Sequence, residues 1–228
     1  MEDPVEYQLP GLNQVQVHPE IGFDFSAGLR SVVRQDPDVI MVGEIRDQVT
    51  CQIAMQAALT GHLVFSTVHT NDAPSAYTRL LDLGVEEFLL DAALVSIIAQ
   101  RLVRKLCEKC SMPASDATTL IDQYQLGGLA ERAGVEHMDL RAPVGCEHCG
   151  GAGYSGRVAV IEYLRCDESI RSIPKDDQFL MKVKDLNLQT GSRELLQDGL
   201  LKVTSRGAIP IPWLKNPTAL VPMSMFTE

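Results

Sequence analysis

Short apolar runs and amphipathic stretches alternate along the first part of the chain. Residues 39–42 form a continuous, largely β-branched run that follows Asp-Pro and precedes Gly43. This pattern is typical of a strand buried on both faces of a parallel sheet. Residues 63–67 form a second such run, and residues 49–60 between the two repeat apolar side chains at helical spacing. The order strand, helix, strand predicts a βαβ unit with a right-handed crossover.

The same periodicity predicts elements on either side of this unit. We expect three more helices in this half of the chain, at Phe23–Gln35, Ser75–Leu83 and Phe88–Leu106. The basic end of the last one would complement its helix dipole. Alternating residues predict two strands, at Asn13–Val17 and Arg157–Leu164. After Asp167 the chain becomes polar and helical, with the best helix at Ser192–Val203, and the four prolines beyond Gly207 predict an irregular tail.

Polar side chains follow both buried runs. Glu44 comes directly after the first run and its glycine, and His69 follows the second run. Ligands of open α/β sheets bind at the carboxyl ends of the strands. One such strand end alone is typical of an ordinary charged loop, but two together predict a site in which an acid orients an attacking water. Position alone does not distinguish a functional role of His62, at the start of the second run, from a capping or packing role.

The cysteines of the second half predict a metal site. Two C-x-x-C pairs are present, at Cys107, Cys110, Cys146 and Cys149. A single pair leaves redox chemistry open, but two pairs complete the tetrahedral shell that zinc prefers. Since four thiolates leave no position for water, we interpret the site as structural. The glycine-rich residues 150–156 lack the lysine of a phosphate loop and are interpreted as a flexible turn, and the insert is expected to form short helices at 118–124 and 126–133.

Composition restricts the class of protein further. The 228 residues are 45% hydrophobic and carry a formal net charge of -10, which argues against a general nucleic-acid binder. No apolar stretch is long and uninterrupted enough to span a membrane, and the first residues do not form a signal peptide, so we expect a cytosolic protein. No G-x-x-x-x-G-K-[ST] phosphate loop occurs anywhere in the chain.

Several stretches together resemble the ATPases of type II secretion and type IV pilus assembly. Residues 36–47 (DPDVIMVGEIRD) look like the Walker B motif of that family. Residues 2–6 (EDPVE) resemble its Asp box, and residues 61–73 (GHLVFSTVHTNDA) resemble its His box. The paired C-x-x-C is similar to the zinc subdomain of the secretion and pilus-extension members, which the retraction members lack. The resemblance covers Glu2 to about Arg206.

The resemblance implies roles for individual residues. Glu44 matches the Walker B glutamate that acts on the attacking water. Glu2 and Glu6 match acids near the metal and the water, and His62 and His69 match residues that sense or bridge the γ-phosphate region. Arg30 and Arg34 match two arginines before Walker B, whose nucleotide-related role is less defined. The four cysteines match the zinc ligands. The family also implies ATP, Mg²⁺, structural Zn²⁺, a homo-hexamer, and partners among the platform and linker proteins of the inner membrane.

We therefore expect an α/β protein, with part of a RecA-like P-loop NTPase core, a tetracysteine zinc subdomain and a helical C-terminal region. The expected boundaries are 1–106 for the core, 107–156 for the zinc subdomain, 157–206 for the C-terminal region and 207–228 for the tail. The family's Walker A loop lies upstream of the Asp box, so we expect this chain to be the C-terminal portion of a split or truncated ATPase that binds ATP poorly by itself.

The favoured function is that of a motor subunit, peripherally associated with the inner membrane, that powers type II secretion by assembling a pseudopilus. Two alternatives stay open. One is pilus extension by a related ATPase, and the other is a catalytically incompetent, zinc-containing interaction fragment of such an ATPase. An upstream-encoded ATPase half would be a further partner, and no nucleic acid is expected.

Overall fold

The computed structural model describes residues 1–132 and 135–206. Contacts divide the chain into two compact units, of which the first combines Met1–Ile97 with Leu164–Leu186. The second contains Ile98–Tyr163 and, among the described residues, 187–206. The predicted tail lies outside the described residues. The predicted boundaries after residues 106 and 156 stay predictions. The contacts assign Leu164–Leu186 to the first unit.

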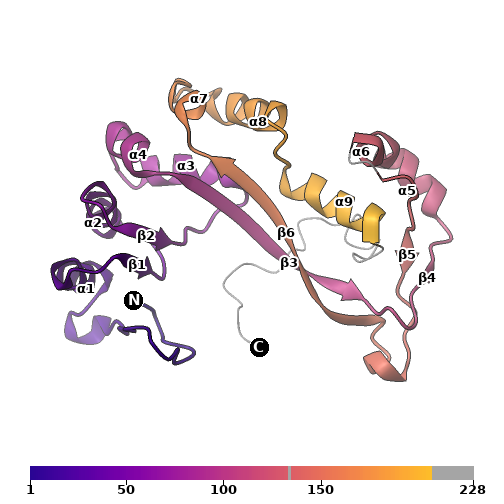
Figure 1. Cartoon of the computed structure of the whole chain (residues 1–228), viewed down its shortest axis with the longest axis horizontal. Helices are drawn as coiled ribbons and strands as arrows, with labels where there is room; N and C mark the ends of the chain where they lie inside the picture. The colour runs from indigo at the N-terminus through magenta and orange to yellow at the C-terminus, as the bar shows by residue number, and fades with distance from the viewer. Residues whose placement is uncertain (133–134, 207–228) are drawn as a thin grey trace. The chain divides into compact units, whose positions relative to one another are not determined.

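The first unit is built around a parallel pair of strands with helices beside it (Figure 1). Its principal elements are α1 (Phe25–Val32), η2 (Val33–Gln35), β1 (Val39–Val42), α2 (Gln48–Leu59), β2 (Leu63–Ser66), α3 (Ala73–Asp82), α4 (Glu87–Ala93), α7 (Glu168–Arg171) and most of α8 (Phe179–Gln189). Strand β1 pairs in parallel with β2, and α1 and α2 pack on each other and on these strands. This confirms the predicted strand, helix, strand order.

Short polar residues begin the helices of this unit. Asp24 accepts a hydrogen bond from the backbone of Ala27 at the start of α1, and Asp47 accepts one from Thr50 at the start of α2, both at 2.8 Å. Such caps satisfy amide groups that have no partner within a helix. The two strands therefore lead into helices whose starting points are set by local sequence.

The prediction that β1 is buried on both faces is wrong for the described chain. Ile40 is 2% exposed and Val42 is fully buried, whereas Val39 and Met41 are 56% and 45% exposed. On β2, the paired neighbours of the exposed residues are themselves 53% exposed, at Leu63 and Phe65. Because side chains alternate across a strand, the exposed ones share one face. The described residues cover only the other face of this sheet.

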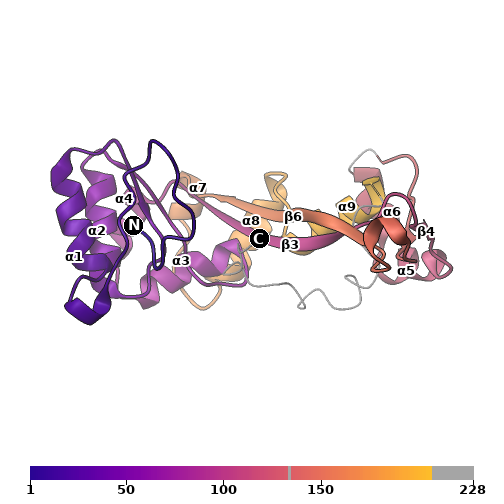
Figure 2. The same cartoon turned by 90° about the horizontal axis from the view of Figure 1, so that it is seen from below.

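The predicted helix Phe88–Leu106 is also wrong. Helix α4 ends at Ala93, and Ser96–Leu106 forms the strand β3, which pairs with β6 (Tyr154–Arg165) in a ribbon that Figure 2 shows lengthwise. Pairing with a strand that is distant in sequence overrides a helical pattern that short apolar runs leave ambiguous. The basic residues at the end of this segment therefore lie on a strand, and no helix dipole explains them.

The second unit carries the insert between the cysteine pairs. Its smaller elements are β4 (Met112–Pro113), α5 (Ala117–Gln123), α6 (Leu126–Arg132), β5 (Arg141–Ala142) and η3 (Glu147–Cys149), and it ends in α9 (Leu195–Arg206). Both short helices predicted in the insert are confirmed. Helix α9 is fastened to β6, because Asp198 accepts a hydrogen bond from the backbone of Ile161 at 2.8 Å and Lys202 donates to the carbonyl of Ala159 at 2.9 Å.

Three smaller predictions need adjustment. The helix expected at Phe23–Gln35 is α-helical only to Val32 and closes with the 3-10 turn η2. The strand expected at Asn13–Val17 is reduced to one parallel bridge between Gln16 and Glu2. Strand β6 begins at Tyr154, so the glycine-rich turn is shorter than expected.

Candidate functional site

The carboxyl ends of β1 and β2 bring Glu44 and His69 together. The His69 Nε2 atom lies 3.1 Å from Oε2 of Glu44, as expected for side chains that follow neighbouring parallel strands. The Glu44 side chain is 13% exposed, whereas that of His69 is 61% exposed. The carboxylate is thus mostly enclosed, whereas the imidazole that contacts it is largely exposed.

Arg46 is a third member of this cluster that sequence reasoning missed. Its Nη2 atom lies 2.5 Å from Oε1 of Glu44, so both carboxylate oxygens have a partner. The hydrogen bond to Glu44 raises the pKa of Arg46 further, and the charges of Glu44 and Asp3 add to this. The spacing Glu-x-Arg was the signal in the sequence, since the two residues are close along the same loop.

Hydrogen bonds tie the two strand ends to each other. Thr67 donates its hydroxyl to the carbonyl of Gly43 at 2.6 Å, and the backbone of Ile45 donates to the carbonyl of Thr67 at 3.0 Å. The last residue of β2, Ser66, has a buried hydroxyl with no hydrogen-bond partner among the described residues. Buried polar groups are nearly always paired, so this hydroxyl is an exception at the edge of the sheet.

The segment of the predicted Asp box lies against the same edge through its backbone. The backbone of Gly43 donates to the carbonyl of Met1 at 2.8 Å, and a side chain at Gly43 would come within 3.5 Å of the Cα atom of Glu2. The carboxylate of Glu2 accepts a hydrogen bond from Gln14 at 2.9 Å. Glu6 lies further along the same segment and is exposed. A glycine before Glu44 thus permits close approach of the acidic segment.

Three other predicted residues lie elsewhere. His62 precedes β2, at the opposite edge from His69, and its Nδ1 atom lies 2.8 Å from the carbonyl of Ala57 at the end of α2. Arg34, in η2, precedes β1 in the same way, and Arg30 is exposed near the end of α1. The described chain does not bring them to Glu44, and their catalytic or nucleotide-binding roles stay predictions.

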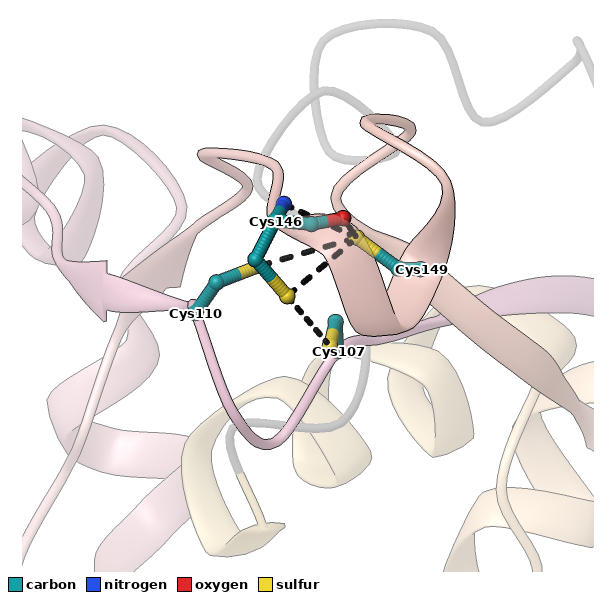
Figure 3. A group of neighbouring side chains, drawn as sticks. All are labelled: Cys107, Cys110, Cys146 and Cys149. Atoms are coloured by element: carbon teal, nitrogen blue, oxygen red, sulfur yellow. Dashed lines mark hydrogen bonds between the residues drawn. The ribbon is translucent and has the colours of Figure 1, made fainter.

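The four predicted zinc ligands converge on one point (Figure 3). Cys107 and Cys110 follow strand β3, while Cys146 and Cys149 flank and end the short turn η3. The sulfur atoms all lie within 4.8 Å of one another, and three pairs are 3.8–3.9 Å apart. Sulfurs bound tetrahedrally at about 2.3 Å from zinc are themselves about 3.8 Å apart. Three of the sulfur pairs therefore already have the spacing that tetrahedral zinc coordination requires, and the four cysteines could hold a zinc ion.

Backbone amides support this cluster from outside. Cys149 accepts hydrogen bonds from the amides of Cys146 and Gly153, both at 3.2 Å, and Cys110 accepts one from Gly145 at 3.4 Å. The amide of Cys146 is the main reason why the pKa of Cys149 falls to about 6, which favours the thiolate that a metal needs. In contrast, burial raises the pKa of Cys110 to about 11.

Glycine is required at the knuckle for steric reasons. Gly145 has φ of +115°, and a Cβ atom there would lie 2.5 Å from the carbonyl oxygen of Gly151. At Gly153 a Cβ atom would meet Pro143 at 2.8 Å. Within the segment expected to be a flexible turn, Gly153 is closely packed against Pro143, and the carbonyl of Gly151 lies against Gly145.

Comparison with known proteins identifies the class of protein to which this arrangement belongs. The sequence model of the family described as "Type II/IV secretion system protein" matches residues 1–212. The chain belongs to this family, whose curated members include type II secretion and type IV pilus assembly ATPases. The resemblance seen in the sequence is thereby confirmed.

Individual relatives are similar along most of this chain. It is 48% identical over 202 residues to the type IV pilus assembly ATPase PilB of Thermus thermophilus. The aligned residues cover 89% of this chain and 22% of that protein. It is 45% identical over 208 residues to the putative type II secretion system protein E of Escherichia coli, which covers 90% of this chain and 40% of that protein. The chain thus spans less than half the length of these relatives.

Solved structures show the same fold. The ATPase DotB of Legionella pneumophila aligns with a TM-score of 0.61 at 22% identity, covering 95% of this chain and 50% of that chain. The pilus retraction motor PilT with bound ADP aligns with a TM-score of 0.55 at 25% identity, covering 98% and 49%. Within the described ranges, no helix combines the length and apolar character needed to cross a membrane.

Proposed function

We propose that this chain is part of an ATP-hydrolysing motor subunit that powers type II protein secretion by assembling a pseudopilus at the inner membrane. The observation that carries the proposal is the contact between Glu44 and His69 at the carboxyl edge of the parallel sheet. Family membership and the similarity to secretion and pilus ATPases support it. By family, the core is RecA-like and works as a homo-hexamer with Mg²⁺.

The geometry suits the handling of an attacking water. Phosphoryl transfer depends mostly on positioning and on stabilising charge, so a carboxylate needs a fixed orientation rather than unusual chemistry. Glu44 is mostly enclosed and is held from two sides by His69 and Arg46, so its oxygens have defined directions. We propose that Glu44 accepts the hydrogen bond of the water and that His69 orients Glu44 and faces the γ-phosphate.

A further proposal concerns the two acids of the predicted Asp box. We propose that Glu2 and Glu6 lie near Mg²⁺ and its water, an environment in which oxygen ligands are preferred. Mg²⁺ would neutralise charge that develops on the phosphates during transfer. Arg30, Arg34 and His62 lie away from Glu44 within one chain, so a role at the nucleotide would require a neighbouring subunit of the hexamer.

The phosphates themselves must be held by something outside this sequence. No G-x-x-x-x-G-K-[ST] occurs in the chain, and such a loop normally supplies the amides and the lysine that bind ATP. The exposed apolar face made by Val39, Met41, Leu63 and Phe65 supports the same view, because parallel sheets are normally covered on both faces. We propose that a phosphate-loop segment, carried by an upstream-encoded half, completes both the site and the sheet.

The cysteine cluster of the second unit would hold structural zinc. Four sulfur ligands leave no open position for a substrate, so the metal would stabilise the fold of residues 107–156. The partners follow from the proposed function: the platform and linker proteins of the inner membrane, to which a cytoplasmic motor binds peripherally. No nucleic-acid partner is proposed.

Two other functions have specific support. The 48% identity to a type IV pilus assembly ATPase favours pilus extension as the process that is driven. The lack of a phosphate loop favours a zinc-containing interaction fragment without catalysis. In the second case the chain would still bind the partner subunits but would not turn over ATP.

An ATPase assay of the chain alone and after fusion to the phosphate-loop half of the E. coli relative tests the proposal. We expect turnover only in the fusion, and we expect Glu44→Gln to lower kcat by about 10²- to 10⁴-fold, the range typical of lost acid–base catalysis. Glu86→Gln, an exposed acid at the start of α4, is the matched control and should leave kcat unchanged. Robust turnover by the chain alone, or a fusion that binds ATP without hydrolysing it, would overturn the proposal.

A further inference from the structure

An ion pair connects helix α8 to the loop that carries His69. The Nζ atom of Lys184 lies 2.8 Å from Oδ2 of Asp72, the residue that ends this loop and begins α3. The other carboxylate oxygen of Asp72 accepts a hydrogen bond from the backbone of Ser75 at 2.8 Å. One carboxylate therefore caps α3 and binds α8 at the same time.

The loop from Thr67 to Asp72 is held at both ends. At its start, Thr67 bonds to the carbonyl of Gly43 and to the amide of Ile45. At its end, Asp72 is held by α3 and by Lys184. His69 lies between these two attachments and contacts Glu44. The position of the imidazole therefore depends on both anchors.

Helix α8 is itself a firm support for Lys184. Its first residue, Phe179, is 2% exposed and its ring centre lies 5.1 Å from that of Tyr77 on α3. Val183, next to Lys184, is fully buried. The Lys175 side chain, just before α8, is 6% exposed and lies 3.6 Å from Glu87. Since these contacts hold the helix to α3 and α4, Lys184 approaches Asp72 from a fixed direction.

The electrostatics of Asp72 agree with a specific contact. Burial alone would raise the pKa of this carboxyl group. The hydrogen bond from Lys184, followed by those from Ser75, outweighs burial and lowers the pKa below its ordinary value. The ionised carboxylate is therefore the form that the native structure prefers, and Lys184 makes the largest contribution to that preference.

We propose that Lys184 is a positioning residue that, through Asp72, holds the loop of His69 so that the imidazole stays against Glu44. The inference rests on the proposed function insofar as Glu44 acts in ATP hydrolysis. It adds that a helix from the C-terminal part of the chain, beyond the cysteine cluster, controls the geometry of the catalytic edge. Lys184 acts through Asp72, with which it forms an ion pair.

A simpler role is a surface ion pair that only helps to dock α8. The two roles differ in what moves when the pair is lost. Loss of a docking contact loosens α8 and its contacts with α3. Loss of a positioning contact releases the loop 67–72 and separates His69 from Glu44, while α8 stays in place because Phe179 and Val183 remain buried.

The test is NMR of the complete zinc-loaded chain with nitrogen-labelled histidine, combined with amide hydrogen exchange. In Lys184→Met we expect the ring signals of His69 to shift toward those of Glu44→Gln, and the amides of residues 69–72 to exchange about two- to five-fold faster. Lys184→Arg should restore both readouts. The control variant is Lys182→Met. Lys182 also lies on α8 and forms an ion pair with Asp176, and its loss should change neither the His69 signals nor the exchange of the loop.

A double variant provides the decisive control. If Lys184 acts through the contact of His69 with Glu44, then Lys184→Met should add nothing to the ring shift already caused by Glu44→Gln. Unchanged His69 signals in Lys184→Met, or faster exchange spread over α8 instead of the loop, would overturn the inference. Because neither readout involves ATP, this failure would leave the proposed ATPase function untouched.

Discussion

The cysteine cluster has all its expected ligands within this chain, whereas the edge around Glu44 has only some of the groups that its proposed chemistry needs. The four sulfurs already lie within 4.8 Å of one another, and amides of the same unit donate hydrogen bonds to Cys149. At the sheet edge, Glu44 has partners, but His69 and Arg46 are 61% and 66% exposed and the chain has no phosphate loop. A metal site can close within one small unit, whereas a phosphoryl-transfer site needs groups from several parts of a larger protein.

Removal of the metal should have the largest effect, since it would destroy the complete site. Structural zinc sites have apparent binding free energies of about 10–16 kcal/mol that count toward folding. We expect chelation, or Cys146→Ser, to unfold residues 107–156 while the sheet of the first unit persists. Metal analysis with limited proteolysis measures this. Cys51→Ala, in a buried thiol of the other unit, should keep full zinc occupancy. Little zinc in freshly purified protein would contradict the view that the cysteine cluster is the complete site of the two.

Two adjacent residues of β1 measure how far the sheet is incomplete. Ile40→Ala should lower the free energy of unfolding by about 2–5 kcal/mol, because it leaves a cavity in the covered face. Met41→Ala, on the exposed face, should change it by about 0.5 kcal/mol or less. Urea denaturation of the chain measures both. Fusion to a phosphate-loop half should increase the cost of Met41→Ala, and an unchanged cost would show that this face stays uncovered.

The smallest effect should come from Asp72. Its pKa is lowered in the folded chain, so its charge stabilises the fold above the ordinary value of 3.8, and that contribution disappears as pH falls through the folded pKa. Asp72→Asn keeps an oxygen for the cap of α3 but loses the charge opposite Lys184. We expect a cost of about 0.5 kcal/mol at pH 7 that vanishes at pH values below the lowered pKa of Asp72. Urea denaturation at several pH values measures it, and a cost independent of pH would contradict the ion pair.

Much of the fold could be predicted because its signals are local. The helix at 48–59, the strands on either side of it and both short helices of the insert follow from periodicity and caps. The strand β3 could not be predicted in the same way, because its apolar residues suit a helix equally well until β6 pairs with it. The exposure of Met41 was equally hidden, since a continuous apolar run does not reveal which of its faces a neighbour covers.

The sites divide along the same line. Glu44, His69 and the four cysteines were predicted correctly as neighbours, because parallel strands end at one edge and two C-x-x-C knuckles suit one metal. Arg46 and Lys184 were missed. The contact of Arg46 with Glu44 depends on the conformation of a loop. The contact of Lys184 with Asp72 depends on the docking of a helix that is distant in sequence.

The sequence by itself determined the family, the order of the strands and helices around Walker B, and the four cysteines of the candidate metal site. These depend on motifs whose residues are close together or repeat at a fixed spacing. Only the tertiary structure decided that 96–106 is a strand, that one face of β1 is exposed among the described residues, and that Lys184 forms an ion pair with Asp72. The physical reason is that pairing, burial and ion contacts between distant segments are properties of packing, which local patterns do not specify.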